Sequence, residues 1–160
     1  SEERMMSDFY LSIGDEVCFS KTVGETDVYL YAGITGDFSP NHVNEAEMRR
    51  SKYGRRIAHG ALLIGYMSTT STLIVERLNG ARTAETPVSL GYDRIRFLAP
   101  VFIGDTITVL YRITDIDAER RRTRADITVT YDQGTAVAVA QHILKWGPNE
   151  TYRSPLPCDA

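Results

Sequence analysis

The 160-residue chain has only two cysteines, no excess of positive charge and no long apolar run. Cys18 and Cys158 lie near opposite ends and match no metal-ligand or redox spacing, so we expect a reducing, cytoplasmic location. The formal net charge of −3 gives no reason to expect nucleic acid as a partner. Because no apolar segment is long enough to insert into a bilayer, we expect neither a secretory segment nor a membrane partner.

The composition is that of a globular protein. Apolar residues make up 42% of the chain and charged residues 24%, and the length suffices to bury a core without disulfide bonds. We therefore expect one domain over residues 1–160. The segment 147–160 contains three prolines and is predicted to form an extended C-terminal tail.

Helix signals dominate the first half of the chain. Thr26 is predicted to cap a short helix that ends at Gly36. Asn44 and Glu47 form a capping pair for a helix of one or two turns that ends near Gly54. The longest helix is predicted over residues 59–78, and its apolar content on nearly all sides indicates a mostly buried helix. Asn79-Gly80 supplies the signal that ends it.

One predicted strand precedes the helical segments in the sequence, and four follow them. Residues 14–23 have the composition of an edge strand, and apolar residues alternate with period two in four later segments, residues 88–97, 107–113, 127–131 and 137–146. Short turns between them predict antiparallel hairpins. The expected fold is α+β, with a curved antiparallel sheet wrapped around the long helix. Since such a sheet leaves an open edge, we expect a homodimer; whether dimers pair again is left open.

One short loop, GDFSPNHV, carries the chemistry. Asp37 and His42 lie five positions apart, and Pro40 restricts the backbone between them. A carboxylate and an imidazole at this separation can hold one water molecule and move its protons. The same composition also suits a plain turn, in which the aspartate bonds its own backbone and the histidine packs locally.

Gly60 follows in the first turn of the long helix. Backbone N–H groups are unpaired there and the helix dipole is positive, so a ligand carbonyl oxygen could be stabilised with no side chain in its way. Close packing of the helix start is the alternative reason for a glycine. An acid–base pair followed so soon by a free helix N-terminus favours an active site.

These residues carry a resemblance to a known family. The stretch YAGITGDFSPNHVNE, followed by IAHGALL and later by RIRFLAPVFIGDTI, resembles the MaoC-like (R)-specific enoyl-CoA hydratases, which have the hot-dog fold. The resemblance covers most of the chain. It implies reversible addition of water to a trans-2-enoyl-CoA thioester, or the reverse dehydration, without a metal or cofactor. None of the three histidines has metal-ligand spacing in the sequence.

The resemblance also implies roles for individual residues. Asp37 and His42 become the catalytic pair, Gly60 becomes the oxyanion donor, and Ser68 occupies the position of a supporting serine. Asn41 stands where an aliphatic residue is usual, so a polar acyl chain is one interpretation of this site.

A basic run could meet the phosphates of coenzyme A, and it includes Arg55 and Arg56. A solvated helix end is the alternative interpretation of the same run. Two other functions stay open for the chain, a hot-dog acyl-CoA thioesterase and a non-catalytic acyl-CoA-binding module. The absence of Asp and Glu between Gly60 and Val75 counts against the thioesterase, and the intact Asp37–His42 pair counts against the binding module.

Overall fold

The computed structural model describes residues 9–78, 85–132 and 134–149. Within them a five-stranded sheet has the order β1-β3-β4-β5-β2, and every neighbouring pair is antiparallel. The strands are β1 (Glu16–Thr22), β2 (Glu85–Phe97), β3 (Thr106–Asp117), β4 (Arg122–Tyr131) and β5 (Thr135–Pro148). The predicted antiparallel hairpins and the predicted edge strand are confirmed, since β1 and β2 form the two edges.

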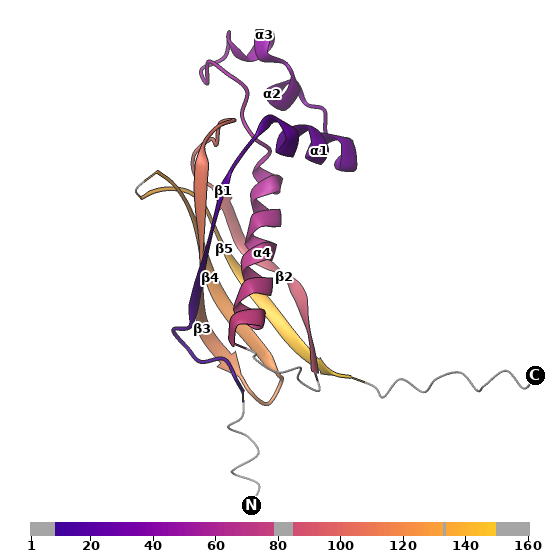
Figure 1. Cartoon of the computed structure of the whole chain (residues 1–160), viewed down its shortest axis with the longest axis vertical. Helices are drawn as coiled ribbons and strands as arrows, with labels where there is room; N and C mark the ends of the chain where they lie inside the picture. Colours follow the sequence, from indigo (N-terminus) through magenta and orange to yellow (C-terminus); the bar gives the residue numbers. More distant parts are fainter. Residues whose placement is uncertain (1–8, 79–84, 133, 150–160) are drawn as a thin grey trace, which may run out of the picture.

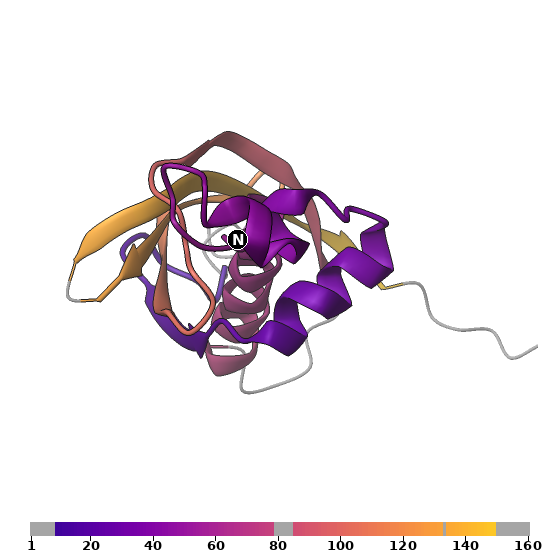
Figure 2. The same cartoon turned by 90° about the horizontal axis from the view of Figure 1, so that it is seen from above.

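The sheet curves around the long helix α4 (Gly60–Leu78), as Figures 1 and 2 show. Alternate residues of β3 are fully buried on the face toward α4; they are Ile107, Val109, Tyr111 and Ile113. Because apolar residues alternate along β3, one face of the sheet forms an apolar layer, and the buried side of α4 forms the second layer of the core. The α+β hot-dog arrangement expected from the sequence is the one observed.

The helix α4 is less enclosed than its composition suggested. It begins at Gly60, one residue later than predicted, and the predicted end at Asn79-Gly80 lies outside the described residues. One stripe along it is exposed, formed by Ala61, Gly65, Ser68 and Thr72. Because α4 packs mainly on β1 and β3, this side toward β2 is left open.

Three short helices lie over the N-terminal end of α4 (Figure 1). They are α1 (Glu25–Thr35), α2 (Pro40–Val43) and α3 (Glu45–Met48). The predicted cap at Thr26 is wrong, because Gly24 is the N-cap residue and its N–H donates to the carboxylate of Asp27 at 2.7 Å. The carboxylate three residues into the helix thus replaces the hydroxyl we expected.

The cap at Asn44 is confirmed, since its side-chain oxygen accepts from the N–H of Glu47 at 3.1 Å. The helix it starts is a single turn, however, and ends at Met48 rather than near Gly54. At the other end of the chain, β5 continues through residues 147–148, so the predicted tail does not begin at residue 147. Residues 150–160 lie outside the described part.

No helix in the described ranges combines the length and apolar character needed to cross a bilayer.

A buried histidine interrupts the apolar layer. His142 is fully buried on β5; its Nδ1 lies 2.9 Å from the Tyr111 hydroxyl and its Nε2 lies 2.7 Å from that of Ser89. Tyr92 stacks on the ring at 4.3 Å. Burial lowers the pKa of His142 to about 4, so the imidazole is neutral in the folded protein near pH 7.

This burial predicts acid sensitivity. The unfolded chain takes up a proton at His142 near pH 6.5, whereas the folded chain does so only near pH 4. Folding stability should therefore be complete above pH 6.5 and fall as the pH drops toward 4, by on the order of 3 kcal/mol from this group. His142→Gln removes this titration, so urea unfolding at pH 7 and pH 5 should show a smaller decrease for the variant. Equal decreases would contradict the assignment.

Candidate functional site

Asp37 directly follows α1. Gly36 ends that helix in the left-handed conformation (φ 80°), which turns the chain so that Asp37 begins the loop. The Oδ1 atom of Asp37 accepts from the N–H of Ser39 at 3.2 Å. The aspartate therefore forms the local turn that we kept as an alternative. Its Oδ2 atom remains available and lies 4.0 Å from Nε2 of His59, and the side chain is half exposed.

His42 lies on the single turn α2, which begins at Pro40. Proline suits this first helical position, so the predicted stiff loop is partly a helical turn. The Nδ1 atom of His42 lies 2.7 Å from the carbonyl oxygen of Ile57. Because a carbonyl only accepts, Nδ1 carries the proton and a neutral His42 presents the Nε2 lone pair.

His59 is a site residue that the sequence reasoning did not select. Its side chain is 2% exposed, and its Nε2–H donates to the backbone carbonyl oxygen of Asp37 at 3.0 Å. The ring stacks on that of His42 with 3.7 Å between centroids. Its position just before Gly60, in the motif used for the family resemblance, was the available signal. His59 joins the loop of Asp37 to the start of α4.

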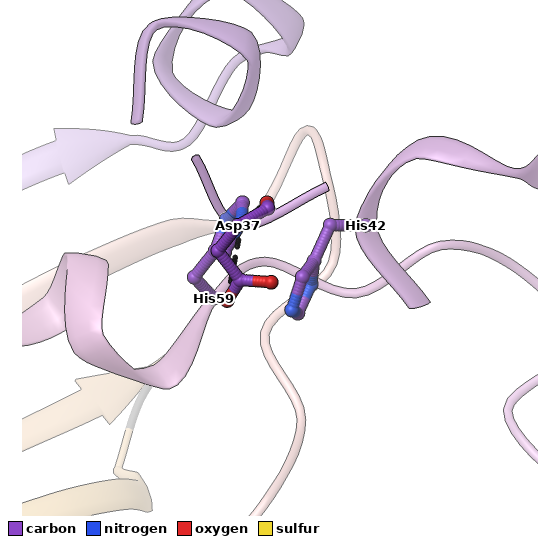
Figure 3. A group of neighbouring side chains, drawn as sticks. All are labelled: Asp37, His42 and His59. Atoms are coloured by element: carbon purple, nitrogen blue, oxygen red, sulfur yellow. Dashed lines mark hydrogen bonds and ion pairs between the residues drawn. The ribbon is translucent and has the colours of Figure 1, made fainter. Parts of the chain in front are cut away.

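Asp37, His42 and His59 form one cluster in which a ligand atom from each lies within 4.8 Å of the others. Figure 3 shows the Asp37 carboxylate directed toward the His42 ring. Two of the three histidines thus come together in space, although the sequence spacing gave no sign of it. The cluster fits a metal ion poorly, because stacked rings direct their in-plane lone pairs side by side and His59 already donates through Nε2.

Gly60 opens a cavity of about 310 Å³ beside this cluster. His42 and Gly60 line it together with apolar residues, which are Ile57, Ala58, Leu63, Phe97, Leu98, Ala99, Pro100 and Val101, and with Tyr53. Gly60 is the first residue of α4, and within the described residues its N–H has no acceptor. A Cβ atom here would lie 2.9 Å from the Phe97 ring, so a larger residue would fit only if that half-exposed ring moved.

The arrangement therefore places two kinds of group close together. Asp37 and the Nε2 lone pair of His42 are acceptors that can hold a water molecule, and the Gly60 N–H, on the wall of the cavity, is a donor at the positive end of a helix. An oxygen that gains negative charge beside Gly60 would be stabilised there. The geometry suits addition of water to a polarised substrate.

Two other predicted residues lie apart from the cluster. The side chain of Ser68 lines a second cavity on α4 and is not among the residues of the first. Asn41 is exposed, and its carbonyl oxygen accepts from the N–H of Ile57 at 3.0 Å. Its amide does not line the cavity either, so its observed role is to hold the segment before α4.

The two arginines proposed for substrate binding differ in availability. Arg56 is nearly buried; its Nε donates to Glu45 at 3.0 Å and its other nitrogens pair with Glu25. Both carboxylates raise its pKa above the ordinary value, and the guanidinium is committed to joining α1 and α3. Arg55 is exposed and lies over the Phe102 ring at 4.0 Å, so it is the more available cation.

Comparison with known proteins gives consistent relatives. The family described as MaoC like domain matches residues 9–137. An (R)-specific enoyl-CoA hydratase of Rhodospirillum rubrum is 36% identical over 108 residues, which cover 68% of this chain and 69% of that protein. A 3-hydroxybutyryl-CoA dehydratase of Methylorubrum extorquens is 32% identical over 146 residues, which cover 91% of this chain and 87% of that protein.

Among solved structures, an (R)-hydratase from A. caviae involved in PHA biosynthesis superposes with a TM-score of 0.73 at 25% identity. The alignment covers 84% of this chain and 96% of that one. The fold and the sequence thus lead to the same group of relatives.

The anchoring role of His59 can be tested without a substrate. His59→Phe keeps a ring against His42 but removes the bond to the Asp37 carbonyl. The backbone amides of residues 37–39 and 41–43 should then exchange hydrogen roughly tenfold faster, the effect of one neutral hydrogen bond. The melting temperature should change little, because two effects oppose each other. The variant loses the hydrogen bond to Asp37, but it also removes the cost of burying Nδ1, which has no partner within the described residues.

Tyr31→Phe is the matched control, since the Tyr31 ring contacts His59 at 4.6 Å and the change keeps that ring. Exchange in the loop should stay at the wild-type rate in this variant. Unchanged exchange in His59→Phe would show that the loop is held by other contacts.

Proposed function

The chain belongs to the MaoC-like domain family, and from this premise we propose that it hydrates trans-2-enoyl-CoA reversibly to (R)-3-hydroxyacyl-CoA. The carrying observation is that Asp37 and His42 lie in one cluster, and that His42 and the unpaired N–H of Gly60 line one largely apolar cavity. The first two are suited to hold water and the third to hold a thioester oxygen. These are the two partners that the reaction must bring together.

Asp37 is proposed as the general base. Its Oδ2 removes a proton from water as the oxygen bonds to Cβ of the substrate. His42, protonated on Nε2 for this step because Nδ1 donates to Ile57, gives that proton to Cα; the proton on Asp37 then passes to Nε2 of His42 and restores both groups. Addition of the hydroxyl and the proton from the side of this pair gives a syn product.

Gly60 is proposed to stabilise the transition state. Negative charge moves toward the thioester oxygen as water adds, and the N–H at the start of α4 can donate to it. In well-studied oxyanion holes, one such donor lowers the barrier by roughly 3–4 kcal/mol. The apolar walls exclude bulk water and strengthen this interaction.

Neither competing function gains a supporting observation. The helix segment from Gly60 to Val75 has no Asp or Glu, so α4 offers no carboxylate near the cavity for thioester hydrolysis. A non-catalytic binding module would not need a carboxylate and a neutral imidazole beside an unpaired helix N–H. We retain hydration as the function.

For the coenzyme A portion, we propose Arg55 as a phosphate contact and assign Arg56 to the ion-pair network with Glu25 and Glu45. We also propose that the reaction needs no metal or further cofactor, since proton transfer and oxyanion stabilisation are supplied by side chains and backbone. A reducing cytoplasmic compartment is proposed as well; the free, exposed thiol of Cys18 supports it.

The function is tested by following the loss of enoyl absorbance of crotonyl-CoA, free thiol release and product configuration. Wild type should form the (R)-3-hydroxy product without releasing thiol. Asp37→Asn and His42→Ala should each lower the rate by at least about a hundredfold, the scale of general acid–base catalysis. The double variant should be little slower than the worse single variant, because both groups act on one water.

An (S) product, or thiol release faster than hydration, would contradict the proposal. Additive losses in the double variant would mean that Asp37 and His42 do not share a water. Melting of each variant is measured as a control, and little change is expected because both residues lie outside the buried core.

We further propose that the protein is a homodimer joined along β2. This strand forms one edge of the sheet and exposes large apolar residues, Val88 at 55% and Leu90 at 50%. An exposed edge of this kind is a template for pairing with another strand. A second copy placed there would also cover the open stripe of α4.

Light scattering after gel filtration should therefore give twice the monomer mass of 17.9 kDa. Val88→Lys with Leu90→Lys should shift the protein to monomer, since lysines at a strand edge oppose pairing. Leu30→Lys, on the exposed side of α1, is the matched control and should stay dimeric. A monomeric wild type at micromolar concentration would refute the dimer.

A further inference from the structure

The helical turn that carries His42 has little apolar packing. This turn, α2, is four residues long and has no buried residue. The next helix, α3, is equally short, and Met48 is its one buried residue. Helices of a single turn are not stable by themselves, so contacts with other segments must hold them. The position of His42 therefore depends on polar contacts more than on the apolar core.

The segment directly before α4 supplies three of these contacts. The N–H of Ile57 donates to the carbonyl oxygen of Asn41 at 3.0 Å, and the carbonyl oxygen of Ile57 accepts from Nδ1 of His42 at 2.7 Å. Nη1 of Arg56 donates to the carbonyl oxygen of His42 at 3.4 Å. Both the main chain and the ring of His42 are thus held by the same two neighbouring residues.

The Arg56 guanidinium also joins the helices on either side of α2. Its Nε donates to Glu45, the first residue of α3, at 3.0 Å. Its Nη1 and Nη2 both donate to Glu25, the first residue of α1, and Nη1 lies 3.3 Å from the hydroxyl of Tyr29 on the same helix. One guanidinium thus contacts α1, α2 and α3, because its donors point in several fixed directions.

This network is better shielded than an ordinary surface ion pair. The side chain of Arg56 is 11% exposed, whereas that of Arg112, which pairs with a glutamate on the sheet, is 56% exposed. Exposed ion pairs contribute little to stability, but charged hydrogen bonds with limited access to water are stronger. Arg56 does not line the catalytic cavity, whereas His42 does. Any effect of Arg56 on the reaction must therefore pass through the residues that it holds.

Building on the proposed hydratase function, we propose that Arg56 is a positioning residue for His42. Its guanidinium joins the three short helices so that the His42 imidazole stays beside the cavity and next to the Asp37 carboxylate. Arg56 acts through the carbonyl oxygen of His42 and through the two glutamates, without contact with the thioester. Loss of these bonds should slow turnover, because a small displacement of a reacting group lowers the rate strongly.

Kinetics with two thioesters separate positioning from phosphate binding. Crotonyl-CoA carries the phosphates of coenzyme A, and S-crotonyl-N-acetylcysteamine carries the same acyl group without phosphate. Arg56→Lys keeps the charge, but its single ammonium cannot reach both carboxylates and the His42 carbonyl together. For this variant kcat/KM should fall about ten- to a hundredfold with both thioesters, and KM for crotonyl-CoA should stay within about twofold.

Arg112→Lys is the matched control. Arg112 also binds a glutamate through two guanidinium nitrogens, since its Nε lies 2.9 Å and its Nη2 2.7 Å from Oε2 of Glu16. This pair lies between β3 and β1, so both rates should equal those of wild type.

Glu25→Gln gives a second test should Arg56→Lys fail to fold. It removes one charge of the network at a side chain that is half exposed. The value of kcat should fall less than in Arg56→Lys, again without a change in KM. The melting temperature of every variant is measured, and rates are compared well below it.

Proton NMR of the imidazole groups tests the positioning without a substrate. The Nδ1–H of His42 is bonded to the Ile57 carbonyl, so it should give a slowly exchanging signal in wild type that is absent in His42→Ala. In Arg56→Lys this proton should exchange roughly tenfold faster, and in Arg112→Lys it should exchange as in wild type.

The outcomes distinguish this proposal from the one it rests on. A higher KM for crotonyl-CoA alone, with kcat unchanged, would make Arg56 a phosphate contact and overturn the positioning role. Rates and a His42 signal that Arg56→Lys leaves unchanged would overturn it as well. If wild type hydrates neither thioester, the hydratase function fails, and the His42 signal still decides whether Arg56 holds that residue.

Discussion

The position of the α4 N-terminus is the constraint on which the rest of the site depends. The segment before the helix is joined to the loop after β2 by two contacts. The N–H of Ala58 donates a hydrogen bond to the carbonyl oxygen of Val101, and Ile57 forms an antiparallel β-bridge with Phe102. The Nε2–H of His59 then holds the carbonyl of Asp37. The Gly60 N–H and the His42 imidazole, which come from separate segments, are thereby kept beside one cavity, with the Asp37 carboxylate next to His42. Contacts between segments therefore fix the site, since none of these segments could place the groups alone.

Two histidines are buried at positions where their hydrogen bonds fix other residues. His59 lies under the catalytic loop and His142 lies within the sheet, and both are nearly inaccessible to solvent. Each imidazole acts through a hydrogen bond whose direction is decided by its other neighbours. In both cases the histidine holds another group in place, the backbone carbonyl of Asp37 or the hydroxyl of Ser89. These hydrogen bonds offset part of the cost of burying each imidazole.

Much of the fold could be predicted because its signals are local. Period-two alternation in β3 and the apolar content of α4 each reflect one face of one element. The cap at Asn44 is also a local signal. The prediction of Thr26 as a cap was wrong because the Asp27 carboxylate accepts from the N–H of Gly24, which starts the helix at Gly24. The exposed stripe of α4 could not be foreseen, since apolar content alone does not tell which side a neighbouring strand covers.

The sequence by itself determined the chemistry available near α4. Asp37, His42 and Gly60 stand in one short stretch, and their types set what they can donate or accept. Only the tertiary structure decided which partners they meet. His59 joined the cluster, Arg56 was taken up by Glu25 and Glu45, and Ser68 was placed in a second cavity. The reason is physical: residue type limits the bonds a group can form, but contacts between distant segments depend on how the sheet curves around the helix.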